Sequence, residues 1–279
     1  MTKTLLLSDG WQFAKSDLQQ ATPAGLDFMS IDLPHDWLIY DTQNLYEDSI
    51  GWYKRHLDYN GTKHVFLYFE GIYMDCSLFV NGTWIGDWKY GYSSFEYEIT
   101  HALKAGKNEI LIKVIHQTPN SRWYSGAGIY RDVWLKLRNT DYIVTNGLYI
   151  SSKPKDGRYD AWNLELECEV MMGSQSFLEL GYSILAGNQI LANCTQIISP
   201  QQGIVVDRQK LLVENVQVWG PENPHLYELV VTLTNAKTNK VLETFTQKIG
   251  FKEVILDPRQ GLFLNGQRTK LKGVCEHHD

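Results

Sequence analysis

The densest group of chemically versatile residues is the segment Cys275-Glu276-His277-His278-Asp279 at the end of the chain. Thiolates, imidazoles and carboxylates are the side chains that zinc binds most often in proteins. Neighbouring residues of an extended segment point to opposite faces, however, so these side chains cannot easily close around one ion. We therefore predict no metal site here, and we expect no cofactor in the chain.

A glycine-rich stretch is the second candidate for a site. Gly126-Ala127-Gly128-Ile129-Tyr130-Arg131 is followed by residues with the pattern of a strand. A phosphate-binding or dinucleotide-binding loop needs a helix directly after it, so neither function fits. Two glycines allow a tight crossing of the chain, and we predict a structural role for them.

Aromatic residues are abundant, at 13% of the chain, and several stand near turns. Their rings could stack on the faces of sugars. Packing in a core or an interface is the interpretation we favour, because an aromatic ring buries a large apolar area. The residues concerned are Trp84, Trp88, Tyr90 and Tyr92.

Composition excludes several classes of partner. The 26 basic and 32 acidic residues give a net charge of -6, and no basic run suits a nucleic acid. No segment approaches the ~18 apolar residues that cross a bilayer, and Met1 to Phe13 lacks the apolar core of a signal peptide. We expect a cytoplasmic protein without nucleic-acid or membrane partners. Its four scattered cysteines predict reduced, mostly buried thiols.

The elements that must position any site are β-strands, because apolar residues recur at every second position. In Leu164 to Val170, three glutamates alternate with four apolar residues, which fits a half-buried antiparallel strand. In Ile110 to Val114, the side chains of Ile110, Ile112 and Val114 must face inward if Lys113 is solvated. No dozen residues show helical periodicity, although 99–103 could form one helical turn. The sequence therefore predicts an all-β fold.

Turn signals divide the chain into many short strands, which is typical of β-sandwiches. They include Asn60-Gly61, Asn81-Gly82, Gly187-Asn188 and Asn265-Gly266. We predict one sandwich over residues 1–140 and an immunoglobulin-like one over 141–250. Residues 251–279 hold a hairpin signal and a short apolar strand, Leu271 to Val274. These last residues are too few to bury a core, so we expect them to open a further domain.

Several motifs in this order resemble family 2 of the glycoside hydrolases, which includes β-galactosidases and β-glucuronidases. Each motif is weak by itself, but together they extend over the whole chain. The main ones are Leu33-Pro34-His35-Asp36-Trp37, Gly51-Trp52-Tyr53-Lys54-Arg55, Phe79-Val80-Asn81-Gly82, Gly126-Ala127-Gly128-Ile129-Tyr130-Arg131, Trp219-Gly220-Pro221-Glu222-Asn223-Pro224 and Leu271-Lys272-Gly273-Val274.

The resemblance implies a jelly-roll, galactose-binding-like β-sandwich, then an immunoglobulin-like β-sandwich, then the start of a truncated TIM barrel. Enzymes of the family are retaining, and a retaining mechanism requires two carboxyl groups about 5–5.5 Å apart. In the family these are glutamates on later barrel strands. We therefore expect no catalytic residue in this fragment and no hydrolysis by it, and we expect its own C-terminal TIM barrel to be its partner in the parent chain.

The resemblance also implies substrate-binding residues. By the Gly-Val-x-x-His pattern, His277 matches a histidine that helps to hold the sugar, and His278 follows it with a less defined role. Asp48 lies in a loop that reaches the active site in related enzymes, and a carboxylate can accept hydrogen bonds from two sugar hydroxyls. Asn120 and Arg122 lie in a loop near the barrel mouth. For Asp48, Asn120 and Arg122, a purely solvated loop position remains an equal alternative.

The function implied is that of the non-catalytic N-terminal region of a retaining glycosidase, with β-galactosidase activity in the parent and a β-linked glycoside as its carbohydrate partner. The alternative is a free-standing carbohydrate-binding module built on the same sandwiches. A reading frame that continues past Asp279 into barrel strands would favour the enzyme.

Overall fold

The computed structural model describes residues 2–40, 42–121 and 125–275. It is built almost entirely of antiparallel strands, with one short 3-10 helix, η1 (Thr100–Ala102), where the sequence predicts a single helical turn. The chain divides into two compact units with a boundary between Arg138 and Asn139. We call them the first sandwich (Lys3–Arg138) and the second sandwich (from Asn139 onward).

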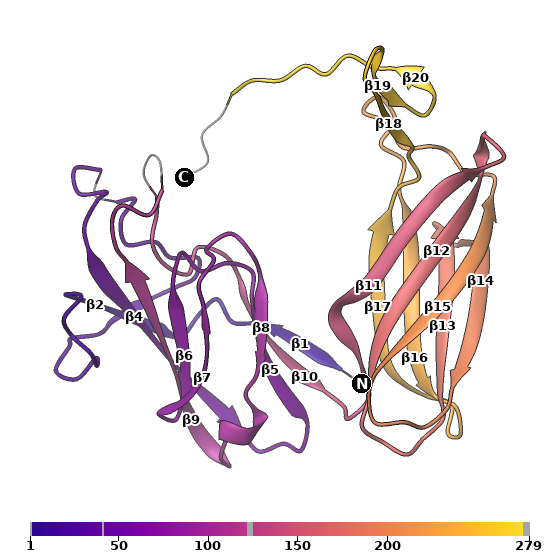
Figure 1. Ribbon diagram of the computed structural model, residues 1–279. Helices are drawn as coiled ribbons and strands as arrows, with labels where there is room; N and C mark the ends of the chain where they lie inside the picture. The colour runs from indigo at the N-terminus through magenta and orange to yellow at the C-terminus, as the bar shows by residue number, and fades with distance from the viewer. Residues whose placement is uncertain (1, 41, 122–124, 276–279) are drawn as a thin grey trace. The chain divides into compact units, whose positions relative to one another are not determined.

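The first sandwich has two antiparallel sheets, whose strands are labelled in Figure 1. One sheet has the order β3-β2-β4-β9-β6-β7 and the other has the order β1-β10-β5-β8. This is the jelly-roll arrangement that the sequence predicts. The strands are β1 (Lys3–Leu6), β2 (Trp11–Ser16), β3 (Met29–Ile31), β4 (Ser49–Tyr59), β5 (His64–Phe69), β6 (Cys76–Val80), β7 (Thr83–Trp88), β8 (Phe95–Glu98), β9 (Gly106–His116) and β10 (Val133–Arg138).

The core of the first sandwich lies between these sheets. Ile110, Ile112 and Val114 on β9 are completely buried, as their alternation with polar residues predicts. They pack in one cluster with Trp11 and Tyr53 from the neighbouring strands β2 and β4. Alternate residues of a strand face opposite sides, so β9 buries every second residue from Asn108 to His116.

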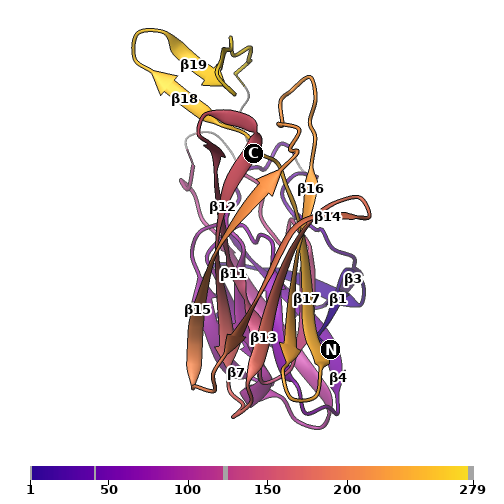
Figure 2. The same cartoon turned by 90° about the vertical axis from the view of Figure 1, so that its right-hand side faces the viewer.

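The second sandwich packs a three-stranded sheet, β11-β12-β15, against a four-stranded sheet, β14-β13-β16-β17, and both layers are visible in Figure 2. It is the immunoglobulin-like sandwich of the prediction. Its strands are β11 (Tyr142–Lys155), β12 (Arg158–Met172), β13 (Leu178–Ala186), β14 (Gln189–Ile198), β15 (Gly203–Glu214), β16 (Tyr227–Asn235) and β17 (Lys240–Ile249).

Strand β12 has the two faces that its sequence predicts. Leu164 and Leu166 are 1% exposed, whereas Glu165 is exposed and forms an ion pair of 2.7 Å with Lys210 on β15. A shift of one residue would turn the glutamates inward. The hydrophobic alternation therefore fixes both the strand and its register.

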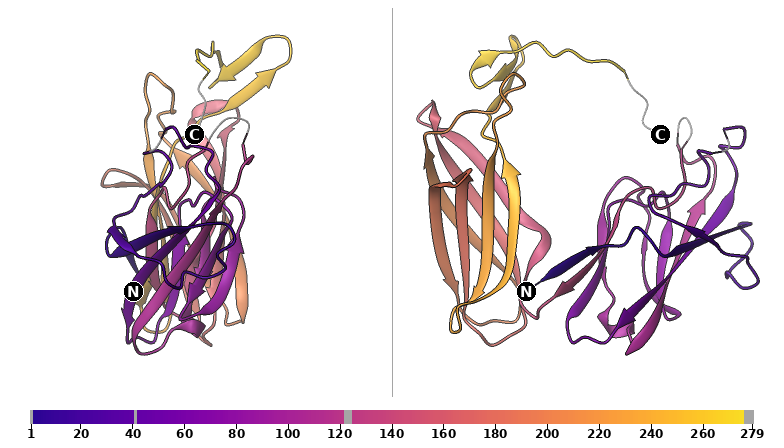
Figure 3. Two further views of the ribbon diagram at one scale, coloured as in Figure 1. Left: turned by 90° about the vertical axis from the view of Figure 1, so that its left-hand side faces the viewer. Right: turned by 180° about the vertical axis from the view of Figure 1, so that it is seen from behind.

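Residues 254–268 form a small sheet, β18-β19-β20, which Figure 3 shows beyond the end of the second sandwich. Its strands are β18 (Val254–Asp257), β19 (Gly261–Leu264) and β20 (Gln267–Arg268). The predicted hairpin at Asn265-Gly266 is confirmed, with both residues at positive φ. The predicted strand Leu271 to Val274 is wrong for this structure, because a strand needs hydrogen-bonded neighbours and Val274 is 90% exposed.

No helix among the described residues is long and apolar enough to cross a membrane.

Candidate functional site

Two loops of the first sandwich carry the predicted sugar-contacting residues that the structure describes. Asp48 directly precedes β4, and Asn120 follows the end of β9. The carboxylate Oδ1 of Asp48 accepts hydrogen bonds from the backbone N–H of Thr118, at 2.7 Å, and from the Thr118 hydroxyl, at 2.9 Å. Since Thr118 is only two residues from Asn120, this contact brings the two loops together.

The Asp48 carboxylate is exposed, so a ligand can reach it. The backbone N–H of Thr118, and then its hydroxyl, lower the pKa of Asp48 below its ordinary value. The side chain is therefore an ionised hydrogen-bond acceptor at neutral pH, which suits contact with sugar hydroxyls but not proton donation.

Asn120 is half-buried. Its Oδ1 accepts a hydrogen bond from the hydroxyl of Ser125 at 3.1 Å, and a longer one of 3.4 Å from the hydroxyl of Tyr73. Its buried Nδ2 finds no acceptor within the described part of the chain. The Asn120 amide is thus hydrogen-bonded through its oxygen, by contacts within the first sandwich.

His116, the last residue of β9, contacts both loops. It is completely buried; its Nδ1 lies 2.6 Å from the carbonyl oxygen of Glu47, and its Nε2 lies 3.2 Å from the hydroxyl of Ser125. A carbonyl oxygen can only accept a hydrogen bond, so Nδ1 carries a proton. The Ser125 hydroxyl lies between the His116 ring and the Asn120 amide, and it thereby links the end of β9 to the loop of Asn120.

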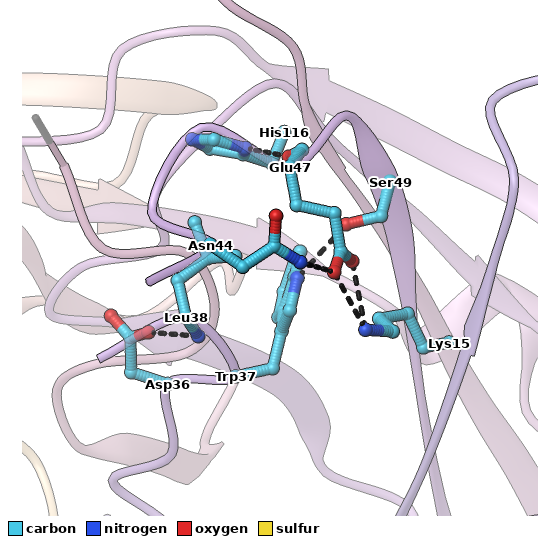
Figure 4. A network of polar contacts seen from close by, with 8 residues as sticks. All are labelled: Lys15, Asp36, Trp37, Leu38, Asn44, Glu47, Ser49 and His116. Carbon is cyan, nitrogen blue, oxygen red and sulfur yellow. Dashed lines mark hydrogen bonds and ion pairs between the residues drawn. The ribbon is translucent and has the colours of Figure 1, made fainter. Parts of the chain in front are cut away.

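Glu47 anchors the loop that carries Asp48, and Figure 4 shows its contacts with Lys15 and Asn44. Its Oε2 accepts hydrogen bonds from Lys15 at 2.9 Å and from Asn44 at 2.7 Å. Burial acts to raise the pKa of Glu47, but the hydrogen bonds from Lys15 and Ser49 outweigh it, so the pKa lies below its ordinary value. Glu47 is therefore a charged structural anchor at neutral pH.

The glycine-rich stretch has the structural role that its sequence predicts. It runs beside the loop 34–37, and the Asp36 carboxylate accepts a hydrogen bond of 2.9 Å from the backbone N–H of Ala127. Gly128 has φ +139°, and a Cβ there would overlap the carbonyl oxygen of His35 and the hydroxyl of Tyr53. A Cβ at Gly126 would overlap the Asp36 carboxylate. Only glycine fits at Gly128, whereas a Cβ at Gly126 would displace the Asp36 carboxylate.

The aromatic residues divide between packing and exposure. Trp88 stacks on Phe95, with ring centroids 5.0 Å apart, which confirms the packing interpretation for this residue. Trp84 and Tyr90, by contrast, are 57% and 63% exposed. Tyr92 is 41% exposed and contacts Tyr73 edge to face.

The other predicted site residues, Arg122, His277 and His278, lie outside the described residues. Across the ranges 2–40, 42–121 and 125–275, no three His, Cys, Asp or Glu side chains are grouped closely enough to hold a metal ion.

Sequence reasoning missed the residues that position the site, above all His116, Ser125 and Thr118. The run His116-Gln117-Thr118-Pro119-Asn120 offered one signal, because polar residues gather there at the end of a buried strand. Nothing local, however, shows that its partners lie near residue 47.

Comparison with known proteins gives a consistent result for both sandwiches. Residues 12–139 match the sugar binding domain of glycosyl hydrolases family 2, and residues 154–252 match a second domain model of the same family. The chain is 31% identical to the β-galactosidase BoGH2A of Bacteroides ovatus over 96% of its own length, and 29% identical to a β-glucuronidase of Bacteroides fragilis over 99%. It spans only 34% and 41% of those two proteins.

Solved structures agree with the sequence matches. A family 2 glycosyl hydrolase from Bacteroides cellulosilyticus superimposes with a TM-score of 0.88 at 28% identity, over 99% of this chain and 40% of the other. The β-glucuronidase 2 of Bacteroides uniformis, covalently bound to cyclophellitol-6-carboxylate aziridine, gives 0.88 at 26% identity, over 100% and 36%. Because the jelly roll, the immunoglobulin-like sandwich and the motifs on both match along nearly the whole sequence, the chain belongs to glycoside hydrolase family 2 and corresponds to its N-terminal region.

Proposed function

We propose that the two sandwiches are the non-catalytic part of a retaining β-galactosidase, and that they supply sugar contacts to an active site built on a TIM barrel. The observation that carries the proposal is the match to the Bacteroides ovatus β-galactosidase over 96% of this chain. The β-glucuronidases among the relatives make glucuronides the competing substrate class.

The geometry of the loops supports a binding role and not a catalytic one. Retaining hydrolysis needs a nucleophile and a proton donor, and the donor needs a raised pKa. In Glu47 and Asp48, acids of the described part of the candidate loop, the pKa is instead lowered. We therefore expect the 279-residue chain to hydrolyse neither galactosides nor glucuronides.

Asp48 and Asn120 are the described residues that we assign to sugar contact. The two loops that carry them are joined by the hydrogen bonds from Thr118 and by the buried ring of His116. Loops fixed in this way hold polar groups for a ligand at little further entropic cost. We propose Arg122, His277 and His278 as further contacts, on the motif match only.

The decisive experiment is an assay of the polypeptide that carries these sandwiches together with a barrel, against nitrophenyl β-galactoside, β-glucuronide and other nitrophenyl glycosides. Hydrolysis of the galactoside supports the proposal. Selective hydrolysis of the glucuronide would instead identify glucuronides as the substrate class. A reading frame that ends at Asp279 would instead favour a carbohydrate-binding module.

A variant test addresses the assigned contacts. In the active polypeptide, His277→Ala should lower kcat/KM strongly while the unfolding midpoint changes little, because a polar contact to the sugar stabilises the transition state and not the core. An unchanged kcat/KM would reject the assignment of His277. The 279-residue chain, incubated overnight with both substrates, serves as the control without a barrel.

A further inference from the structure

A cavity of about 240 Å³ opens on the first sandwich, beside the glycine-rich stretch. Its size is below the ~300–1,000 Å³ of pockets for drug-sized ligands, so it suits one small ring. Four tyrosines dominate its walls. The lining residues are Pro34, His35, Asp36, Ile39, Tyr40, Tyr73, Tyr92, Gly126 and Tyr130.

Two of the tyrosines are fixed before any ligand binds. The hydroxyl of Tyr130 donates a hydrogen bond of 2.8 Å to the carbonyl oxygen of Gly91. Tyr73 exchanges two backbone hydrogen bonds with Gly128, and its ring contacts Tyr92 edge to face at 5.2 Å. Ordering side chains on binding costs entropy. Because these two tyrosines are already ordered, the cavity avoids most of that cost, and a ligand that makes only weak contacts can still bind.

The other two tyrosines are exposed to an unusual degree. Tyr40 is 81% exposed and Tyr92 is 41% exposed, although a large ring normally gains free energy by burial. Ile39, beside Tyr40, is 53% exposed. Grouped exposed apolar side chains around a cavity are typical of a ligand site.

The polar groups of the cavity select the class of ligand. The Asp36 carboxylate excludes an anion, and no Lys or Arg is among the lining residues. It already accepts hydrogen bonds from the backbone N–H groups of Leu38, Ile39 and Ala127, which disperse its charge and leave little attraction for a cation. Tyrosine rings that carry hydroxyls match a neutral ligand with an apolar face and a hydroxylated edge. A pyranose ring has both.

We propose that this tyrosine-lined cavity is a carbohydrate subsite that holds one pyranose unit of a β-linked saccharide. The choice of ligand class rests on the proposed function, whereas the cavity itself does not. The subsite belongs to the first sandwich, so it binds sugar without a barrel. Asp48 and Asn120 do not line the cavity, and its one contact with them is the 3.4 Å hydrogen bond that the Tyr73 hydroxyl donates to Oδ1 of Asn120.

The test is saturation-transfer NMR of the 279-residue chain with methyl β-D-galactopyranoside, lactose and choline, followed by titration. We expect transfer to the saccharides with a Kd on the order of 1 mM, and none to choline. Tyr40→Ala and Tyr92→Ala should each weaken binding about three- to tenfold, the range of one aromatic contact. Both side chains are exposed, so the variants should fold. Tyr149→Ala removes a tyrosine from β11 of the second sandwich whose exposure, 65%, lies between those of Tyr40 and Tyr92, and this variant should bind like the unmodified chain.

Three results would overturn the proposal: no transfer to either saccharide, transfer to choline only, or saccharide binding that both tyrosine variants leave unchanged. None of them bears on hydrolysis by a barrel-containing polypeptide, so failure here is distinguishable from failure of the proposed function. Saccharide binding that is weakened by both variants, and not by Tyr149→Ala, supports the subsite even where the nitrophenyl assay is negative.

Discussion

The Nδ1 atom of His116 lies 2.6 Å from the carbonyl oxygen of Glu47, and this contact ties the end of β9 to the loop that carries Asp48. We predict that His116→Ala lowers the free energy of unfolding by about 2–4 kcal/mol, because the Glu47 carbonyl and the Ser125 hydroxyl lose a buried partner. Urea unfolding measures the loss. Hydrogen exchange should also speed up in residues 43–48 and 117–121.

His101 provides the matched control, since it is exposed on η1. His101→Ala should change the free energy of unfolding by less than about 0.5 kcal/mol. Equal stabilities of the two variants would contradict the role assigned to His116.

Gly128→Ala tests the close approach of the glycine-rich stretch to the loop 34–37. The added Cβ would overlap the His35 carbonyl oxygen and the Tyr53 hydroxyl, and φ +139° is strained for alanine. We expect a loss of about 3 kcal/mol or more in the free energy of unfolding, from backbone strain and overpacking together. Gly220→Ala is the control, because a Cβ there meets no atom within 4 Å. If Gly128→Ala is as stable as Gly220→Ala, the glycine-rich stretch and the loop 34–37 can move apart to accommodate the added Cβ.

The contact between Asp48 and Thr118 should depend on pH. Hydrogen bonds from Thr118 depress the pKa of Asp48, so the contact is fully present above the ordinary Asp value of 3.8. It is lost as the pH falls through the depressed value below that. In NMR, the amide proton of Thr118 should shift during this acid titration. Asp48→Asn should abolish the shift. If the Thr118 amide proton still shifts in Asp48→Asn, the shift arises from another titrating group.

The cysteines should differ sharply in reactivity. Burial raises the pKa of the Cys76 thiol to about 12, and that of Cys168 likewise to about 12, whereas Cys275 is exposed. The thiolate is the species that reacts, so iodoacetamide at neutral pH should modify Cys275 in the folded chain and leave Cys76 and Cys168 intact. Mass spectrometry of tryptic peptides identifies the modified sites. Rapid labelling of Cys76 without denaturant would contradict its burial.

The strands could be predicted from the sequence because their signal is local. The alternation from Leu164 to Val170 specifies which face is buried, and the structure buries that face. The segment Leu271 to Val274 shows the limit of the same reasoning. Its apolar residues fit a strand, but pairing depends on neighbours that no residue within the segment reveals.

The site was less predictable because its contacts are distant in sequence. Asp48 was identified from its motif, yet its partner Thr118 is 70 residues away. His116 was missed because a single histidine at the end of a strand has no spacing that reveals its partners. The tyrosine-lined cavity likewise combines residues from positions 34 to 130, and no window of sequence contains them together.

The long separation of these contacts has a consequence for folding. The hydrogen bond between Glu47 and His116 closes 69 residues, and the one between Asp36 and Ala127 closes 91. Closing such loops costs entropy before the contacts return any stability, so sheets joined in this way form slowly. During synthesis, the contacts of the Asp48 loop cannot form until the ribosome has released residue 118, and the tyrosine-lined cavity cannot form until it has released residue 130. Until then, the aromatic residues of the nascent first sandwich remain open to chaperones and to aggregation.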